Sequence, residues 1–84
     1  MPTTALVIED DDLMRVSLVA ALASADVEVV ASAKTSAEAL ELAHTLFPQV
    51  ALVDLHLGRG PTGVDVAHEL RKNDPRIGIV FLTS

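Results

Sequence analysis

Four short apolar runs, separated by three stretches long enough for a helix, constrain this chain more than any other feature. The runs occupy residues 5–8, 27–31, 50–53 and 77–82, and they are rich in Val, Ile and Leu. Short continuous apolar runs are typical of strands buried on both faces. Strands joined by helical segments form parallel sheets with right-handed crossovers. The sequence therefore predicts an α/β fold with the element order βαβαβαβ.

Each intervening segment carries signals for a helix. Asp11 or Asp12 can cap the first, and Thr35 with Glu38 has the spacing of a capping box at the start of the second, which Pro48 ends. We expect the third over residues 64–72, after an irregular glycine-rich loop at 58–63. The first segment also repeats apolar residues at helical spacing: Met14, Leu18, Ala21, Leu22 and Ala25.

Size and charge limit what the chain can do. With 84 residues it forms one small domain at most, and a net charge of −6 argues against binding nucleic acid through this segment. The absence of cysteine excludes disulfides and thiol chemistry. No apolar run approaches the roughly 18 residues needed to span a bilayer, and the N-terminus lacks the basic start of a signal peptide. We therefore expect a cytoplasmic protein with no membrane partner.

Acidic residues follow two of the predicted strands. Glu9-Asp10-Asp11-Asp12 comes directly after the first, and Asp54 ends the third. If these strands are parallel neighbours, both groups lie at the carboxyl edge of the sheet, where open α/β sheets bind ligands. Carboxylates are oxygen ligands, which suit Mg²⁺, Mn²⁺ or Ca²⁺ rather than zinc or copper. An aspartate can also act as a nucleophile toward phosphorus, and Thr83 would bring a hydroxyl to the same edge.

On these motifs the chain resembles the receiver domain of a two-component response regulator. The resemblance covers essentially the whole chain and implies a flavodoxin-like doubly wound sheet, here with strand order 2-1-3-4. Helix 4, strand 5 and helix 5 of the family are absent, so we expect residues 1–84 to be a partial receiver domain, truncated before its fifth strand. The matching residues are Val7-Ile8-Glu9-Asp10-Asp11, Val53-Asp54-Leu55, Gly63 and Phe81-Leu82-Thr83-Ser84.

The resemblance implies a role for each site residue. Asp54 would accept a phosphoryl group from a phosphohistidine on a sensor histidine kinase or phosphotransfer protein. Asp10 would ligate Mg²⁺ directly, Glu9 mainly through water, and His56 through its backbone carbonyl. Thr83 would be the switch hydroxyl that moves toward the phosphoryl oxygens and carries the signal to an output function.

The family also has a lysine on its fifth strand. Neither lysine of this chain, Lys34 or Lys72, is expected at the end of a strand, so neither is assigned that role.

Other readings stay open at this stage. The chain could be a receiver-like interaction module that is not phosphorylated, or an Mg²⁺-dependent phosphohydrolase with an aspartyl nucleophile, although such an enzyme would place that nucleophile just after the first strand. As a receiver, its phosphoryl-transfer and dephosphorylation chemistry would serve regulation rather than metabolism. We also expect self-association through the exposed edge of the fourth strand. The histidines, expected at the surface or in a loop, are His44, His56 and His68.

Overall fold

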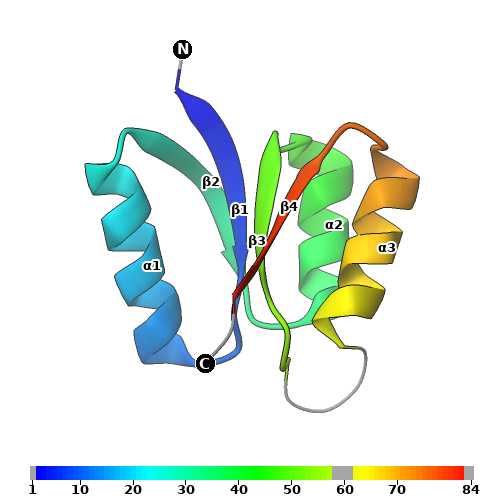
Figure 1. The fold of residues 1–84 in the computed structure, drawn as a ribbon, viewed down its shortest axis with the longest axis horizontal. Helices are drawn as coiled ribbons and strands as arrows, with labels where there is room; N and C mark the ends of the chain where they lie inside the picture. The colour runs from blue at the N-terminus through cyan, green and yellow to red at the C-terminus, as the bar shows by residue number, and fades with distance from the viewer. Residues whose placement is uncertain (1, 58–61, 83–84) are drawn as a thin grey trace.

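The computed structural model describes residues 2–57 and 62–82, which form a parallel sheet with helices on both of its faces (Figure 1). The irregular loop predicted at 58–63 falls largely outside these residues, as does Thr83. Among the residues described, no helix is both long enough and apolar enough to cross a bilayer. The strands are β1 (Thr3–Ile8), β2 (Val27–Ala33), β3 (Val50–Asp54) and β4 (Gly78–Leu82), and the helices are α1 (Asp12–Ser24), α2 (Ser36–Leu46) and α3 (Gly63–Asn73).

The strands are arranged in the order β2-β1-β3-β4, and every pairing is parallel. This confirms the predicted α/β fold and its strand order. Helix α1 lies on one face of the sheet, and α2 and α3 lie side by side on the other (Figure 1). The carboxyl ends of all four strands therefore meet at one edge.

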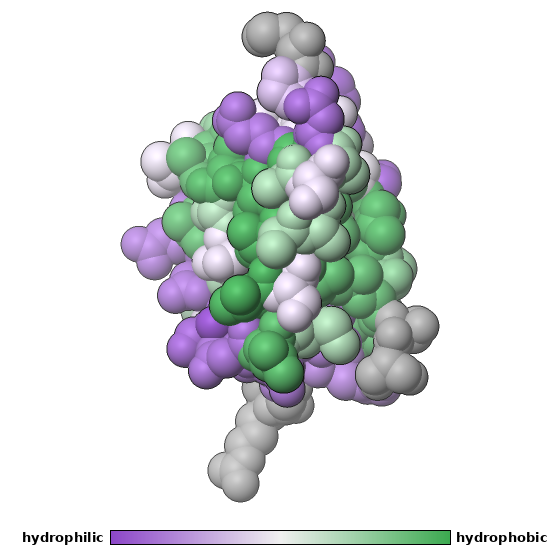
Figure 2. All heavy atoms as spheres, turned by 90° about the vertical axis from the view of Figure 1, so that its left-hand side faces the viewer, coloured by the Kyte–Doolittle hydropathy of each residue, from purple (hydrophilic) through white to green (hydrophobic). Residues whose placement is uncertain are grey.

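The two sides of the sheet are packed to different extents. The principal core lies between the sheet and helices α2 and α3, whereas α1 has no fully buried residue. The predicted inward-facing residue Met14 is 47% exposed, and hydrophobic residues are visible over much of the α1 side in Figure 2. Helical spacing thus identified the helix correctly but overestimated its burial. The buried residues of the principal core include Leu6, Ile8, Ala39, Ala43, Val53, Val66, Leu70 and Ile77.

The helix starts follow local hydrogen bonding. Of the two candidate caps for α1, Asp11 is the N-cap: its carboxylate accepts a hydrogen bond from the Met14 amide at 2.9 Å. At α2, Thr35 caps as predicted, but the reciprocal bond of a capping box is displaced by one residue. The carboxylate of Glu38 accepts from the backbone N–H of Lys34 at 2.8 Å instead.

One expectation about the lysines is wrong. Strand β2 continues through Ser32 to Ala33, because pairing with β1 persists up to Ile8, so Lys34 directly follows the end of a strand. Ser32 obscured this in the sequence, since a polar residue there looked like the end of the apolar run. Main-chain pairing with a neighbour, rather than side-chain hydropathy, sets the length of this strand.

Candidate functional site

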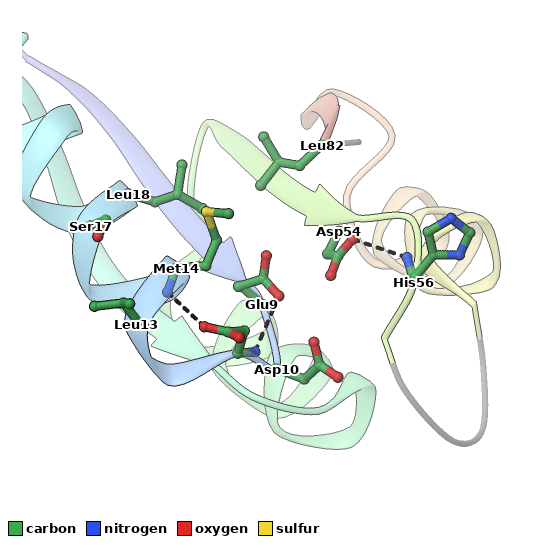
Figure 3. A pocket seen from close by; sticks show the side chains of 10 residues that line it. Glu9, Asp10, Leu13, Met14, Ser17, Leu18, Asp54, His56 and Leu82 are labelled. Carbon is green, nitrogen blue, oxygen red and sulfur yellow. Dashed lines mark hydrogen bonds between the residues drawn. The ribbon is translucent and has the colours of Figure 1, made fainter. Parts of the chain in front are cut away.

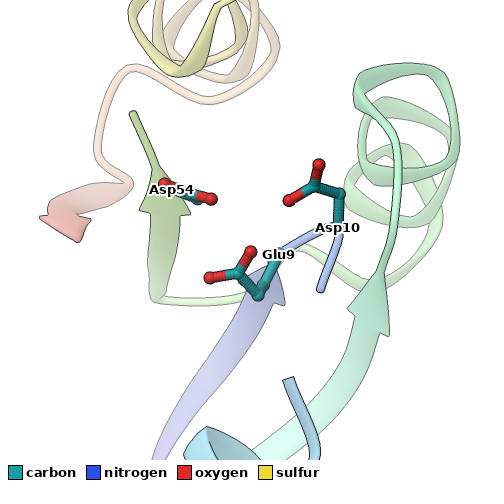
Figure 4. Close-up of side chains that lie close together, drawn as sticks. All are labelled: Glu9, Asp10 and Asp54. Carbon is teal, nitrogen blue, oxygen red and sulfur yellow. The ribbon is translucent and has the colours of Figure 1, made fainter. Parts of the chain in front are cut away.

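Strand register brings the predicted acidic residues together. Ile8 of β1 is aligned with Val53 of β3, so the next residue of each strand, Glu9 and Asp54, emerges at the same edge. Asp10 follows immediately. One ligand oxygen from each of these three carboxylates lies within 4.8 Å of the others, and Figure 4 shows the three side chains turned toward a common point.

Backbone hydrogen bonds fix the two strand ends that carry these acids. The N–H of Glu9 donates to the carbonyl of Ala33 on β2 at 3.0 Å. On the other side, the N–H of Leu55 donates to the carbonyl of Leu82 at 3.2 Å, and the N–H of Gly63 donates to the carbonyl of Leu55 at 3.2 Å. The acids therefore sit on rigid main chain on both β1 and β3.

Two of the carboxylates are also oriented by nearby amides. The N–H of Asp11 donates to Glu9 Oε2 at 3.2 Å, and the N–H of His56 donates to Asp54 Oδ1 at 3.0 Å (Figure 3). Both are bonds to the residue two positions earlier, as in an Asx turn. They hold the carboxylates in place without a cationic side chain.

The electrostatic state of Glu9 reflects its burial among other acids. It is 5% exposed and Asp54 is 9% exposed. The pKa of Glu9 is raised to about 7, mainly by burial; the Asp11 amide opposes this rise, and the neighbouring Asp54 and Asp10 carboxyls add to it. No Lys or Arg is found among the described residues that line the cleft. A buried acid with this environment is stabilised by a proton or by a metal cation.

The acids form the floor of an open cleft of about 630 Å³. Its far wall is mostly apolar and comes mainly from α1, with a contribution from the end of β4 (Figure 3). This wall was not predicted: helical periodicity assigned Met14 and Leu18 to the core, Leu82 was assigned to a strand, and Leu13 and Ser17 were not singled out. The residues of the wall are Leu13, Met14, Ser17, Leu18 and Leu82.

The predicted site residues are thus distributed as follows. Glu9, Asp10 and Asp54 converge, and His56 lines the same cleft. Asp11 and Asp12 begin α1, with Asp11 as its cap. Thr83 lies outside the described residues. His44 and His68 lie on α2 and α3 respectively, as expected.

Two further residues support the site through contacts that were not predicted from the sequence. Arg15 on α1 reaches back to the carbonyl of Glu9. Gly63 begins α3 so close to Asp54 that an added Cβ atom would lie 2.2 Å from the Asp54 carbonyl oxygen. The family resemblance had marked Gly63, but only the packing gives a physical reason for a glycine there.

Comparisons with known proteins agree with this geometry. The sequence profile of the response regulator receiver domain matches residues 5–84. The chain is 34% identical over its full length to the response regulator protein VraR of Staphylococcus saprophyticus and 32% identical to that of Staphylococcus aureus, and it spans about 40% of each.

Similar solved structures include two proteins with comparable identity. The signal receiver domain of a modulated diguanylate cyclase from Desulfovibrio desulfuricans is 32% identical with a TM-score of 0.89; the match covers 100% of this chain and 66% of that one. The response regulator PhyR from Brucella abortus is 31% identical with a TM-score of 0.88, covering 96% of this chain and 33% of that one.

Proposed function

Because this chain belongs to the family of response regulator receiver domains, we propose that it is the phosphoacceptor switch of a two-component system, with Asp54 as the residue that is phosphorylated. The observation that carries this proposal is the convergence of three carboxylates within 4.8 Å at the carboxyl edge of the sheet. Asp54 is the acid of this group that ends the inner strand β3.

The donor set fits Mg²⁺. We assign Asp10 and Asp54 as direct ligands, Glu9 as a ligand mainly through water, and the backbone carbonyl of His56 as the remaining protein ligand. All of these donors are oxygens, which Mg²⁺ prefers, and a cleft of about 630 Å³ leaves room for water and a phosphoryl group. When bound, Mg²⁺ would neutralise the acids and offset the approach of two anions.

The reaction we propose is transfer of a phosphoryl group to a carboxylate. An oxygen of Asp54 forms a bond to phosphorus while the phosphorus–nitrogen bond of a donor phosphohistidine breaks, and the departing imidazole takes up a proton. The amide of His56, 3.0 Å from Asp54 Oδ1, orients the carboxylate for this attack. The donor would be a sensor histidine kinase or a phosphotransfer protein.

Signalling follows from the added charge. A phosphoryl group brings nearly two negative charges and strong hydrogen-bond acceptors to a buried position. In our proposal the hydroxyl of Thr83 moves toward these oxygens and shifts a two-state surface that an output function reads. We place this activity in the cytoplasm, where the histidine kinase would present its phosphohistidine.

Intact-mass measurement tests the assignment. The protein is incubated with a small acyl phosphate and Mg²⁺, and the same is done with Asp54→Asn. Asp26→Asn is the matched control, because it is the same chemical change at an exposed turn between α1 and β2. We expect one phosphoryl group on the parent and on Asp26→Asn, none on Asp54→Asn, and a loss of labelling when Mg²⁺ is chelated.

Other results would point elsewhere. No labelling of the parent by the acyl phosphate or by a histidine kinase would contradict the proposal and favour an interaction module that is not phosphorylated. Labelling that persists in Asp54→Asn would show that another residue is the acceptor. Multiple turnover of phosphate esters would favour a phosphohydrolase.

A further inference from the structure

Arg15 makes a contact that its place on a surface helix does not explain. Its side chain is only 12% exposed, although it belongs to the first turns of α1. Nη1 donates to the backbone carbonyl of Glu9 at 3.0 Å, and Nη2 donates to the carboxylate of Asp12 at 2.5 Å. The guanidinium therefore joins the end of β1 to the start of α1.

The carbonyl that Arg15 binds belongs to the peptide between the two acids. The Glu9 carbonyl and the Asp10 amide share one plane, so a bond to this oxygen fixes the direction in which the Asp10 backbone leaves β1. The other side of Glu9 is fixed by its N–H bond to Ala33 at 3.0 Å. Both backbone groups of Glu9 are thus held, one by β2 and one by Arg15.

A simple ion pair with Asp12 does not account for this arrangement. Asp12 is 72% exposed on its side chain, and exposed pairs contribute little to folding stability. Asp12 instead anchors the guanidinium, since it also pairs with Lys34 at 3.2 Å in the connection from β2 to α2. Arg15 is then directed to the Glu9 carbonyl rather than to the Glu9 or Asp10 carboxylates.

Resting on the proposed function above, we propose that Arg15 is a positioning residue for the metal site. It orients the Glu9–Asp10 peptide so that both carboxylates face Asp54, and its own charge is held by Asp12, outside the cleft. The role requires a planar fork with two N–H donors, because two acceptors on different segments are bound at once. A lysine ammonium at the same position cannot reproduce that geometry.

The sign of the effect on metal affinity separates this role from simple electrostatics. Removing a positive charge near a cation site should strengthen cation binding by Coulomb's law. Loss of a residue that orients metal ligands should weaken it, typically by about 10-fold to 100-fold. The two explanations therefore predict opposite changes for Arg15→Gln.

The test compares Arg15→Gln and Arg15→Lys with the parent protein. Arg76→Gln is the matched control: Arg76 is exposed, lies before β4, and forms no side-chain hydrogen bond or ion pair with the described residues. Mn²⁺ affinity is measured by calorimetry, and a thermal melt checks that each variant is folded. We expect the Mn²⁺ dissociation constant to rise about 10-fold or more in both Arg15 variants and to stay unchanged in Arg76→Gln.

Several results would overturn the proposal. These are an unchanged or lower dissociation constant in folded Arg15→Gln, full retention of affinity in Arg15→Lys, or an equal loss in Arg76→Gln. If Arg15→Gln does not fold, Arg15→Lys decides alone, because it keeps the charge and most of the side-chain length.

A measurement without metal separates this proposal from the proposed function. NMR shifts of the Glu9 carbonyl carbon and the Asp10 amide should change in both Arg15 variants, while most other shifts stay in place. If the parent binds no Mn²⁺, the metal site itself is refuted, and these shifts then decide whether Arg15 fixes the peptide. Unchanged shifts would refute that as well.

Discussion

Replacing Gly63 by alanine should disturb the acidic site through the backbone of Asp54. An ideal Cβ at this position would lie 2.2 Å from the carbonyl oxygen of Asp54 and 2.9 Å from the Cα of Leu55. Ordinary contact begins near 3.4 Å, so α3 and the end of β3 must separate by about 1 Å. Both obstructing groups are backbone, and no side-chain rotation can relieve the clash.

The expected loss of stability follows from this geometry. Overpacking a well-packed site costs about 1–3 kcal/mol, and we expect the upper part of that range because the N–H of Gly63 donates to the carbonyl of Leu55 and holds the two segments together. For a domain of this size each kcal/mol lowers the melting temperature by about 4–8 °C. Gly63→Ala should therefore melt roughly 10–20 °C below the parent. A displacement of about 1 Å at Asp54 should also slow its phosphorylation by about 100-fold.

Gly78 provides the matched control. An added Cβ there would first meet Val50 Cγ2 at 3.5 Å, which is ordinary contact, so Gly78→Ala should be neutral or slightly stabilising. Thermal melts by circular dichroism and phosphorylation rates by intact mass are compared for both variants. If Gly63→Ala has the same melting temperature as Gly78→Ala and is phosphorylated at the parent rate, the close approach of α3 to Asp54 does not constrain the site.

Three other measurements test the structure more broadly. The pKa of Glu9 is about 7 in the folded state and 4.5 when the group is free. Between these values the folded protein keeps a proton that the unfolded chain has released. The free energy of unfolding should therefore fall by up to roughly 3 kcal/mol as the pH rises from 4.5 to 7. Urea melts of Glu9→Gln should lack that slope, and a flat profile for the parent would contradict the shift. Thr62→Val removes the capping box of α3 and should cost about 1 kcal/mol in the same melts; no change would mean that the cap is dispensable. Val80, 47% exposed on β4, should promote self-association of this chain, and Val80→Lys should lower the mass found by light scattering; a monomeric parent would contradict this expectation.

The fold was predictable from the sequence because buried parallel strands and helix caps leave local signals. The element order followed from the apolar runs, the starts of α1 and α2 from their capping residues, and the strand order from the family resemblance; the structure confirms each of them. The full length of β2 did not follow, because its last residues are held by pairing with β1 rather than by hydropathy. The cap of α3 was also missed, since Thr62 and Asp65 follow a glycine-rich stretch that drew attention to the loop.

The sequence predicted which acidic residues form the site, but it did not predict the contacts that hold them in place. Strand ends in a parallel sheet share an edge, so the meeting of Glu9, Asp10 and Asp54 could be expected once the strands were recognised. The contact of Arg15 with the Glu9 carbonyl could not, because it joins residues six positions apart across a strand–helix junction and has no periodic signature. Likewise, the partial exposure of Met14 depends on how α1 sits on the sheet rather than on its own sequence.

Among the described residues, the basic side chains near the carboxyl edge of the sheet do not neutralise the acid cluster. Arg15 and Lys34 both bind Asp12, and neither lines the cleft formed by Glu9, Asp10 and Asp54. Asp12 consequently has a lowered pKa, first through its hydrogen bond with Arg15, while burial raises the pKa of Glu9 to about 7. A proton on Glu9 and a divalent cation among the three carboxylates would relieve the same repulsion, so each opposes binding of the other. The arrangement thus stabilises the fold at the start of α1 and leaves the acid cluster with a deficit of positive charge that a ligand can fill.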